Sequence, residues 1–165
     1  NHPVACVTWE QAQTFCRHNG GALPSEAQWE KAARGTNGQS FPWGEDWSPD
    51  RLNWGDLSSD GAFGAADGAV GASQIATFPT NASPYGALDM AGNVWEWTED
   101  WYGKSYYRRS PEKNPVNRIR SPESGRVVRG GSWSFAGNGA RTTYRYYQAP
   151  STLDDAIGFR CVYSP

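Results

Sequence analysis

Hydrophobic residues recur with helical spacing in two short segments near the start of the chain. Thr8 and Gln11 form the first capping box, in which the Thr8 hydroxyl accepts the N–H of Gln11 and the Gln11 amide reaches back. The glycine pair at 20–21 ends this helix. The residues expected on its buried face are Ala12, Phe15 and Cys16.

A second capping box follows at once, with Ser25 and Gln28 in the equivalent positions. Gly35 is the expected end of this helix. Its predicted buried residues are Trp29, Ala32 and Ala33. The pattern therefore predicts two short helices before residue 36.

The rest of the chain is mostly irregular. Residues 35–84 combine Trp, Gly, Asp and Asn without sustained periodicity, which indicates long loops held in place by buried rings or ions. Residues 104–124 are polar and interrupted by prolines, as in a surface excursion. Strands are predicted at 126–129, before a glycine pair that turns the chain, and at 157–162.

Residues 89–102, DMAGNVWEWTEDWY, are too acidic for a core strand and too aromatic for a plain loop. We expect the rings of Trp95, Trp97, Trp101 and Tyr102 to anchor the core. Asp89 and Glu96 flank a glycine-containing turn that can aim their oxygens at one point. Carboxylate and backbone carbonyl oxygens are the ligands that Ca²⁺ prefers, so this stretch predicts a cation site. Asn53 and Asp67 are candidates for a second one.

Composition supports a loop-rich domain with an aromatic core. The 165 residues include 19 Gly and 11 Pro, hydrophobic residues make up 38%, and there are 9 Trp, 8 Tyr and 6 Phe. This length suits a single domain. No apolar run approaches the roughly 20 residues that cross a bilayer, so no membrane span is expected.

Charge is unevenly distributed along the chain. Residues 1–103 carry 4 Lys or Arg and 13 Asp or Glu, whereas residues 104–165 carry 11 and 4. A net charge of −2 does not favour a nucleic-acid partner. Two explanations stay open for the asymmetry: ion pairs between the two parts, or a site for an anionic ligand.

The three cysteines, Cys6, Cys16 and Cys161, match no metal-binding spacing. Cys16 and Cys161 could close the chain in an oxidising compartment or remain buried thiols in a reducing one. Cys6 is left unpaired in both cases.

Five segments together resemble the sulfatase-modifying-factor family, the formylglycine-generating enzymes and their relatives. They are ALPSEAQWEKAARG, FPWG, YGALDMAGNVWEWTEDWY, RVVRGGSW and IGFRCV, in the family's order. The resemblance implies an α+β, loop-rich variant of the C-type lectin-like fold over residues 1–165. It also implies that the chain is the C-terminal two thirds of such a domain, with the N-terminal strands missing or supplied by a partner segment.

The resemblance implies two calcium sites and a disulfide. One site comprises Asn53, Trp54, Asp67 and Ala69, and the other comprises Asp89, Gly92, Val94 and Glu96. The disulfide joins Cys16 and Cys161. Together these features favour an exported or cell-surface location.

The resemblance does not extend to the residues that carry the family's formylglycine-generating activity. Formylglycine-generating enzymes use two active-site cysteines that hold copper, and residues 134–156 contain no cysteine. Phe135 stands at the first position and Ala140 near the second. The family's iron-dependent members take histidines from another domain, so neither copper nor iron is expected here.

The leading hypothesis is a calcium-stabilised, catalytically silent domain that binds a protein or peptide ligand through residues 134–156. The candidate ligand-binding residues are Phe135, Asn138, Tyr144, Tyr146, Tyr147 and Asp154. Related variable proteins of diversity-generating retroelements diversify this segment, although these side chains also suit an ordinary loop of the fold. The alternatives are an enzyme of the same family that uses residues outside this chain, and a purely structural module. Arg141 and Arg145 are expected to bridge to the acidic residues of 95–101.

Overall fold

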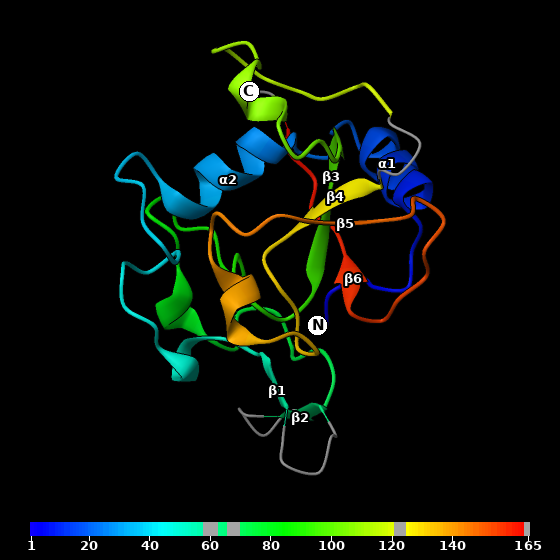
Figure 1. The fold of residues 1–165 in the computed structure, drawn as a ribbon. Helices are drawn as coiled ribbons and strands as arrows, with labels where there is room; N and C mark the ends of the chain where they lie inside the picture. The colour runs from blue at the N-terminus through cyan, green and yellow to red at the C-terminus, as the bar shows by residue number, and fades with distance from the viewer. Residues whose placement is uncertain (58–62, 66–69, 121–124, 164–165) are drawn as a thin grey trace.

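Two short helices pack against a small mixed sheet in the computed structural model, which describes residues 1–57, 63–65, 70–120 and 125–163 (Figure 1). Helix α1 spans Trp9–His18 and α2 spans Glu26–Arg34. Both predicted capping boxes are confirmed. The prediction for Phe15 was wrong, because its side chain is 54% exposed and Trp9 lies on the buried side instead.

The main sheet has four strands in the order β5-β4-β3-β6. Strand β3 (Trp95–Trp101) pairs antiparallel with β4 (Arg126–Arg129) and parallel with β6 (Ile157–Gly158). Strand β5 (Tyr146–Gln148) lies at the edge, antiparallel to β4. The strand predicted at 126–129 is confirmed, whereas the one predicted at 157–162 is a strand only at its first two residues. A separate hairpin joins β1 (Gly55–Leu57) and β2 (Phe63–Ala65).

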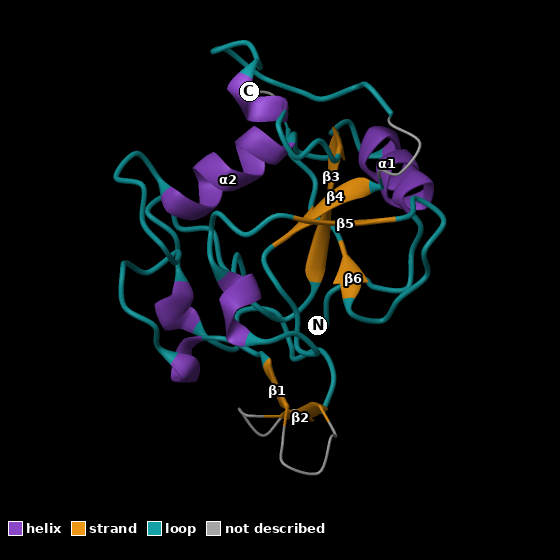
Figure 2. Ribbon diagram, in the orientation of Figure 1, coloured by secondary structure: helices purple, strands orange, loops and turns teal. Residues whose placement is uncertain are grey.

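Loops and turns make up most of the described chain, as Figure 2 shows. They contain four short 3₁₀ helices, η1 (Pro49–Arg51), η2 (Pro79–Asn81), η3 (Tyr106–Arg108) and η4 (Gly137–Ala140), within the described ranges. The class is therefore α+β and loop-rich, in agreement with the composition.

The main core lies between α1 and the sheet. Trp95 and Trp97 of β3 are 4% and 0% exposed and pack with Trp9, together with aliphatic side chains of the neighbouring elements. Trp101 and Tyr102 are only half-buried, so two of the four expected aromatic anchors lie at the margin of the core. Trp29 of α2 forms a second cluster with Ala33 and Met90.

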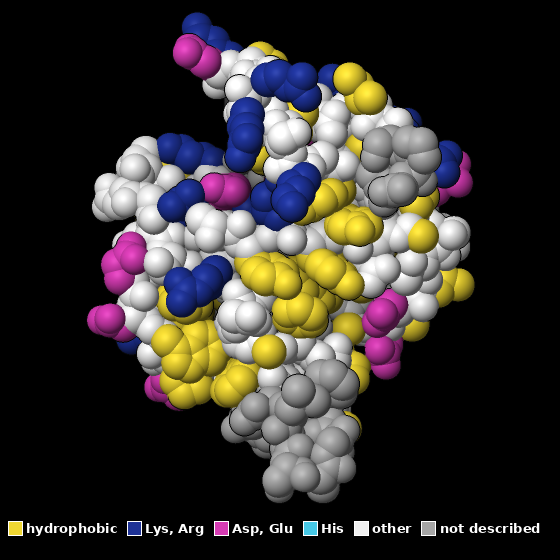
Figure 3. Space-filling model, viewed as in Figure 1, with side chains coloured by type: hydrophobic (Ala, Val, Ile, Leu, Met, Phe, Trp, Pro, Cys, Tyr) yellow, Lys and Arg dark blue, Asp and Glu magenta, His cyan; other side chains and the backbone are white. Residues whose placement is uncertain are grey.

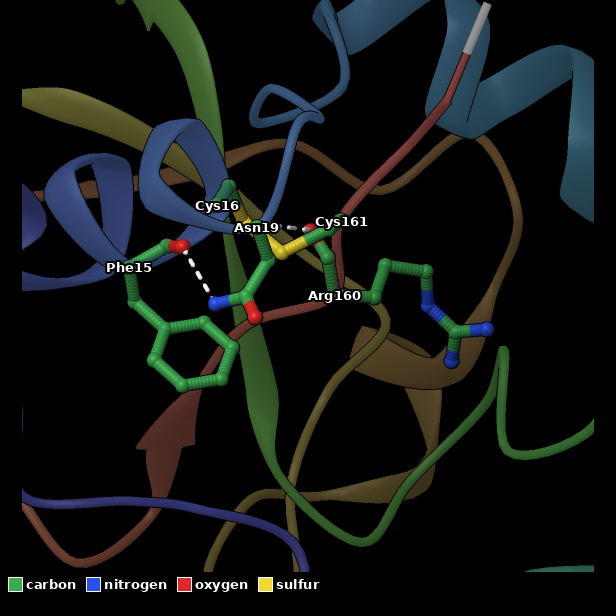
Figure 4. The surroundings of a disulfide bond; sticks show 5 residues. All are labelled: Phe15, Cys16, Asn19, Arg160 and Cys161. Carbon is green, nitrogen blue, oxygen red and sulfur yellow. Dashed lines mark hydrogen bonds between the residues drawn. A yellow bond between two sulfur atoms is a disulfide. The ribbon is translucent and has the colours of Figure 1, made fainter. Parts of the chain in front are cut away.

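The C-terminal segment is tied to the N-terminal part of the chain at several points. Ala5 and Ala22 form isolated bridges with Gly158 and Val162. Cys16 of α1 and Cys161 form a disulfide, whose surroundings are shown in Figure 4. This is the pairing that the family resemblance implies. Cys6 is exposed and carries a free thiol.

Candidate functional site

A group of packed aromatic rings, here called the aromatic face, is built on the start of β3. The Trp95 ring lies 5.1 Å from Phe135, 5.7 Å from Tyr146 and 6.0 Å from Tyr144, measured between ring centroids. Tyr147 adjoins Tyr146 at 5.9 Å. These five residues define the aromatic face. Phe135 and Tyr144 come from the loop between β4 and β5, Tyr146 and Tyr147 from the edge strand β5, and Trp95 from the buried core.

The outer part of the aromatic face is accessible. Tyr146 and Tyr147 are 36% and 40% exposed, whereas Trp95, which packs against Tyr146, is 4% exposed. Tyr147 also stacks on Tyr102, with 4.6 Å between the centroids. Figure 3 shows hydrophobic side chains gathered near the centre of this side of the molecule, beside η4 and below β5, with Lys and Arg side chains above them. The exposed rings are therefore already held in place by packing.

Glycines in η4 allow aromatic rings to lie directly on its backbone. A Cβ atom at Gly139 would come within 2.4 Å of the Phe135 ring, and one at Gly137 equally close to the Trp47 ring. The Phe135 position, which the family resemblance assigns to a thiol, is thus filled by a ring packed on Gly139 and Trp95. Ala140, near the second such position, is 2% exposed and packs in a small apolar cluster.

A largely buried ion-pair network adjoins the aromatic face at Tyr144. The Arg145 guanidinium donates from Nε and Nη2 to the two oxygens of Glu26, at 2.6 and 2.7 Å. Arg129, which is 0% exposed, lies 3.3 Å from Glu26 and donates to Glu30 at 2.6 Å. It also donates to the Tyr144 carbonyl at 2.6 Å, so α2 fixes the loop that precedes β5.

The prediction that Arg141 and Arg145 bridge to residues 95–101 was wrong. Arg145 pairs with Glu26 of α2, and the Arg141 guanidinium lies 5.4 Å from the Phe41 ring centroid. The reason is tertiary: α2, rather than β3, faces the loop that carries these arginines. The basic C-terminal part and the acidic N-terminal part do share ion pairs, which favours the first of the two explanations for the charge asymmetry.

The sequence analysis did not identify Glu26 as the buried partner of Arg129 and Arg145, because an acidic residue in the first turn of a helix is normally exposed.

Asp100 of β3 contributes a second buried carboxylate at the same helix end. Its oxygens accept the backbone N–H groups of Glu26 and Asn117, each at 2.7 Å. Burial raises the pKa of Asp100 to about 6, although these two hydrogen bonds act in the opposite direction.

The other two candidate ligand-binding residues, Asn138 and Asp154, are not part of the aromatic face. Asn138 is exposed on η4. Asp154 is half-buried, and its carboxylate accepts the N–H of Ala156 at 2.8 Å. Its carbonyl accepts the N–H groups of Cys6 and Ile157. Asp154 therefore shapes its own loop.

The first expected calcium site is described in part. Asn53 is 1% exposed, and its Oδ1 atom is buried without a hydrogen-bond partner in the described part of the chain, while Nδ2 donates to the Gly71 carbonyl at 2.9 Å. A cation would satisfy this orphaned oxygen, so Asn53 fits the role. Trp54 follows it directly and is half-buried. Asp67 and Ala69 lie outside the described residues.

At the second expected calcium site, the carboxylate of Glu96 already binds an arginine. Asp89, Val94 and Glu96 line one cavity of about 400 Å³, and Gly92 lies in the turn between them with φ +73°. Both oxygens of Glu96 bind the Arg160 guanidinium, at 2.6 Å each. Within the described ranges, no three His, Cys, Asp or Glu side chains gather as a metal-binding group would.

Comparison with known proteins shows the family. The family model for the Sulfatase-modifying factor enzyme 1-like domain (FGE-sulfatase) matches residues 1–165, and the chain belongs to this family. It is 36% identical over 165 residues to Inactive C-alpha-formylglycine-generating enzyme 2 of Bos taurus, covering 96% of this chain and 49% of that protein. It is also 36% identical over 172 residues to Formylglycine-generating enzyme of Streptomyces coelicolor, covering 98% and 52%.

Solved structures agree with this assignment. PvdO from Pseudomonas aeruginosa superposes with a TM-score of 0.79 at 27% identity, covering 96% of this chain and 60% of that one. Treponema denticola variable protein 1 superposes with a TM-score of 0.77 at 22% identity, covering 96% and 69%, and shares the fold. The chain spans about half the length of the two curated relatives named above.

None of the helices in the described part of the chain has the length and apolar character of a bilayer-crossing segment.

Proposed function

We propose that this chain is a calcium-stabilised, catalytically silent member of the family that binds a protein or peptide ligand through its aromatic face. We assign its fold to the C-type lectin-like variant that the family resemblance implies. The observation that carries the proposal is an exposed pair of tyrosines held by packing: Tyr146 packs on Trp95 and Phe135, and Tyr147 stacks on Tyr102.

The physical argument is one of preorganisation. Tyrosine offers a large amphipathic contact area with few rotatable bonds, so little conformational entropy is lost when a partner binds. Tyr147 is already held by its stack on Tyr102, and Tyr146 by its contact with Trp95. Exposed rings held in this way suit recognition better than chemistry, since the position expected for the first thiol is occupied by Phe135.

The family relationship supports a non-catalytic role without deciding it. One relative at 36% identity is named an inactive formylglycine-generating enzyme. A structural neighbour is named a variable protein. By analogy we propose that residues 134–156 are the variable segment of such a protein. A nearby near-copy of codons 126–160 that differs mainly at adenines would support this, and a genomic neighbourhood without such a copy would refute it.

The ligand-binding proposal is tested with a peptide library displayed on phage and selected on the immobilised chain. Affinity of the selected peptides is then compared between the wild type and the Tyr146→Ala/Tyr147→Ala double variant. We expect a loss of at least tenfold, about 1.4 kcal/mol, because two exposed anchor rings are removed. The matched control is Tyr85→Ala/Tyr163→Ala, which removes two tyrosines that are 59% and 60% exposed elsewhere. Equal binding to both double variants would place the ligand on another surface and refute the proposal.

The second candidate is an enzyme of the same family that takes residues from outside this chain, and it is favoured by the 36% identity to Formylglycine-generating enzyme of Streptomyces coelicolor. Elemental analysis of the purified protein separates the two. Copper or iron near one atom per chain would favour the enzyme, whereas calcium without either would favour the binding domain.

We propose that calcium binds at Asn53, whose buried Oδ1 atom has no partner among the described residues. The expected result of an Asn53→Leu substitution is loss of a calcium-dependent rise in the thermal unfolding midpoint. An unchanged response to calcium would exclude this position as a ligand.

We also propose an exported or cell-surface location, because a disulfide such as Cys16–Cys161 persists in oxidising compartments. Recovery of the protein with both thiols free from the cell that makes it would contradict that location.

A further inference from the structure

The cavity beside β3 brings together a carboxylate and backbone carbonyls, which is the ligand set expected of a divalent-cation site. Glu96 is 5% exposed there, so its charge needs a buried counter-charge. The counter-charge comes from Arg160, which donates from Nε to Oε2 and from Nη2 to Oε1 of Glu96, at 2.6 Å each. Trp29 also hydrogen-bonds the Glu96 carboxylate, donating from Nε1 to Oε2 at 2.7 Å.

The same guanidinium also reaches the carbonyls at the start of the turn. Nη2 of Arg160 lies 3.1 Å from the Leu88 carbonyl oxygen and 3.3 Å from that of Asp89. Arg160 thus binds one carboxylate and two carbonyl oxygens at once. A planar guanidinium with donors on several sides can satisfy such a set, which a lysine could not do in the same way.

The Asp89 carboxylate has its own partners in the loops. Its Oδ2 accepts the N–H of Ala76 at 2.8 Å, and its Oδ1 accepts from the Asn81 amide at 3.4 Å. Asp89 has φ +57°, a left-handed conformation that the two loop contacts help to hold. The two carboxylates expected to share an ion therefore serve different partners.

We infer that the Arg160 guanidinium takes the place of the second calcium ion in this chain. The charge of the Glu96 carboxylate is then balanced without a divalent cation. The inference rests on the contacts of Glu96 and is independent of the proposed ligand-binding role. Figure 4 shows that the Arg160 side chain extends away from the neighbouring disulfide. The C-terminal segment is consequently fastened at adjacent residues, to α1 by Cys161 and to β3 by Arg160.

The test compares thermal unfolding of the wild type and Glu96→Gln, each in excess CaCl₂ and in excess EDTA. We expect Glu96→Gln to lower the midpoint by several degrees, because it leaves the half-buried guanidinium of Arg160 without its counter-charge. This difference should be the same in both buffers, since the partner of Glu96 is part of the chain. If an ion were the partner, the wild type would lose its advantage in EDTA, and that result would overturn the inference.

The matched control is Glu99→Gln, on the same strand, whose carboxylate pairs with the largely exposed Arg118. We expect its midpoint to stay close to that of the wild type in both buffers. Titration calorimetry of the metal-free wild type gives a second measurement that does not depend on the folding of Glu96→Gln. No calcium, or one ion per chain that Asn53→Leu removes, supports the inference, whereas two ions, or one ion that Asn53→Leu retains, overturn it. No binding at all would count against the proposed Asn53 ion while leaving the role of Arg160 intact.

Discussion

Replacing Glu26 with glutamine should destabilise the chain more than its small change in shape suggests. The Glu26 side chain is 0% exposed and pairs with both oxygens to Arg145, and Arg129 lies 3.3 Å away with an exposure of 0%. Glutamine fills the same volume, so no cavity is formed. The loss is therefore electrostatic, because two guanidinium groups keep their charge after their shared carboxylate is removed.

The magnitude can be worked from these contacts. Removing one partner of a buried ion pair costs about 3–5 kcal/mol. The lower end applies here, about 3 kcal/mol, since Arg129 retains Glu30 at 2.6 Å and the Arg145 side chain is 18% exposed. For a chain of this size that corresponds to a fall of about 6–12 °C in the unfolding midpoint.

The assay is urea unfolding followed by tryptophan fluorescence, with Glu10→Gln as the control. Glu10 also lies in the first turn of a helix but is exposed, so its substitution should change the free energy of unfolding by no more than about 0.5 kcal/mol. The double variant Glu26→Gln/Arg145→Gln should lose at least about 1 kcal/mol less than the sum of the single losses. Equal stability of the Glu26 and Glu10 variants, or strict additivity of the double variant, would refute this account of the network.

Three further outcomes follow from the structure. First, Asp100 has a native pKa near 6 and an unfolded value of 3.8, so the native state binds this proton more tightly. Protonated Asp100 therefore adds about 3 kcal/mol to the free energy of unfolding. This stabilisation is complete below pH 3.8 and is lost as the pH rises through about 6. Urea unfolding across this range should show a fall that Asp100→Asn removes, and an identical pH profile for the variant would contradict it. Second, reducing the Cys16–Cys161 disulfide, which closes a separation of 145 residues, should cost up to about 5 kcal/mol in the chain-entropy estimate, and an unchanged urea midpoint in reductant would refute this. Third, Gly139→Ala should cost about 1–3 kcal/mol and displace Phe135, because its Cβ would meet that ring at 2.4 Å. Near-ultraviolet circular dichroism that matches the wild type would contradict the third outcome.

Local pattern predicted the helices well because capping is a short-range interaction. The hydroxyls of Thr8 and Ser25 accept N–H groups three residues further on, and both helices begin where these boxes place them. The burial of Phe15 was mispredicted for a related reason. Periodicity identifies a face, but it does not say how far the neighbouring sheet extends beneath it.

The sequence predicted the aromatic residues of 134–156 that form the candidate site, but not the strand pairing and ion pairs that hold them in place. Tyr144, Tyr146 and Phe135 do gather, around Trp95. Their arrangement depends on β5 pairing with β4, a long-range contact that short strands signal weakly. Glu26 and Arg145 are 119 residues apart in the sequence, so no local spacing could have paired them.

The sequence by itself determined the two helix starts, the aromatic and loop-rich composition, and the set of motifs by which the family is identified. These features depend on neighbouring residues or on residue identity alone. The tertiary structure decided which charges meet: Glu26 with Arg145, and Glu96 with Arg160. Buried charges must find a partner wherever the fold brings one close, and that distance is set by the packing of α2, β3 and the C-terminal segment together.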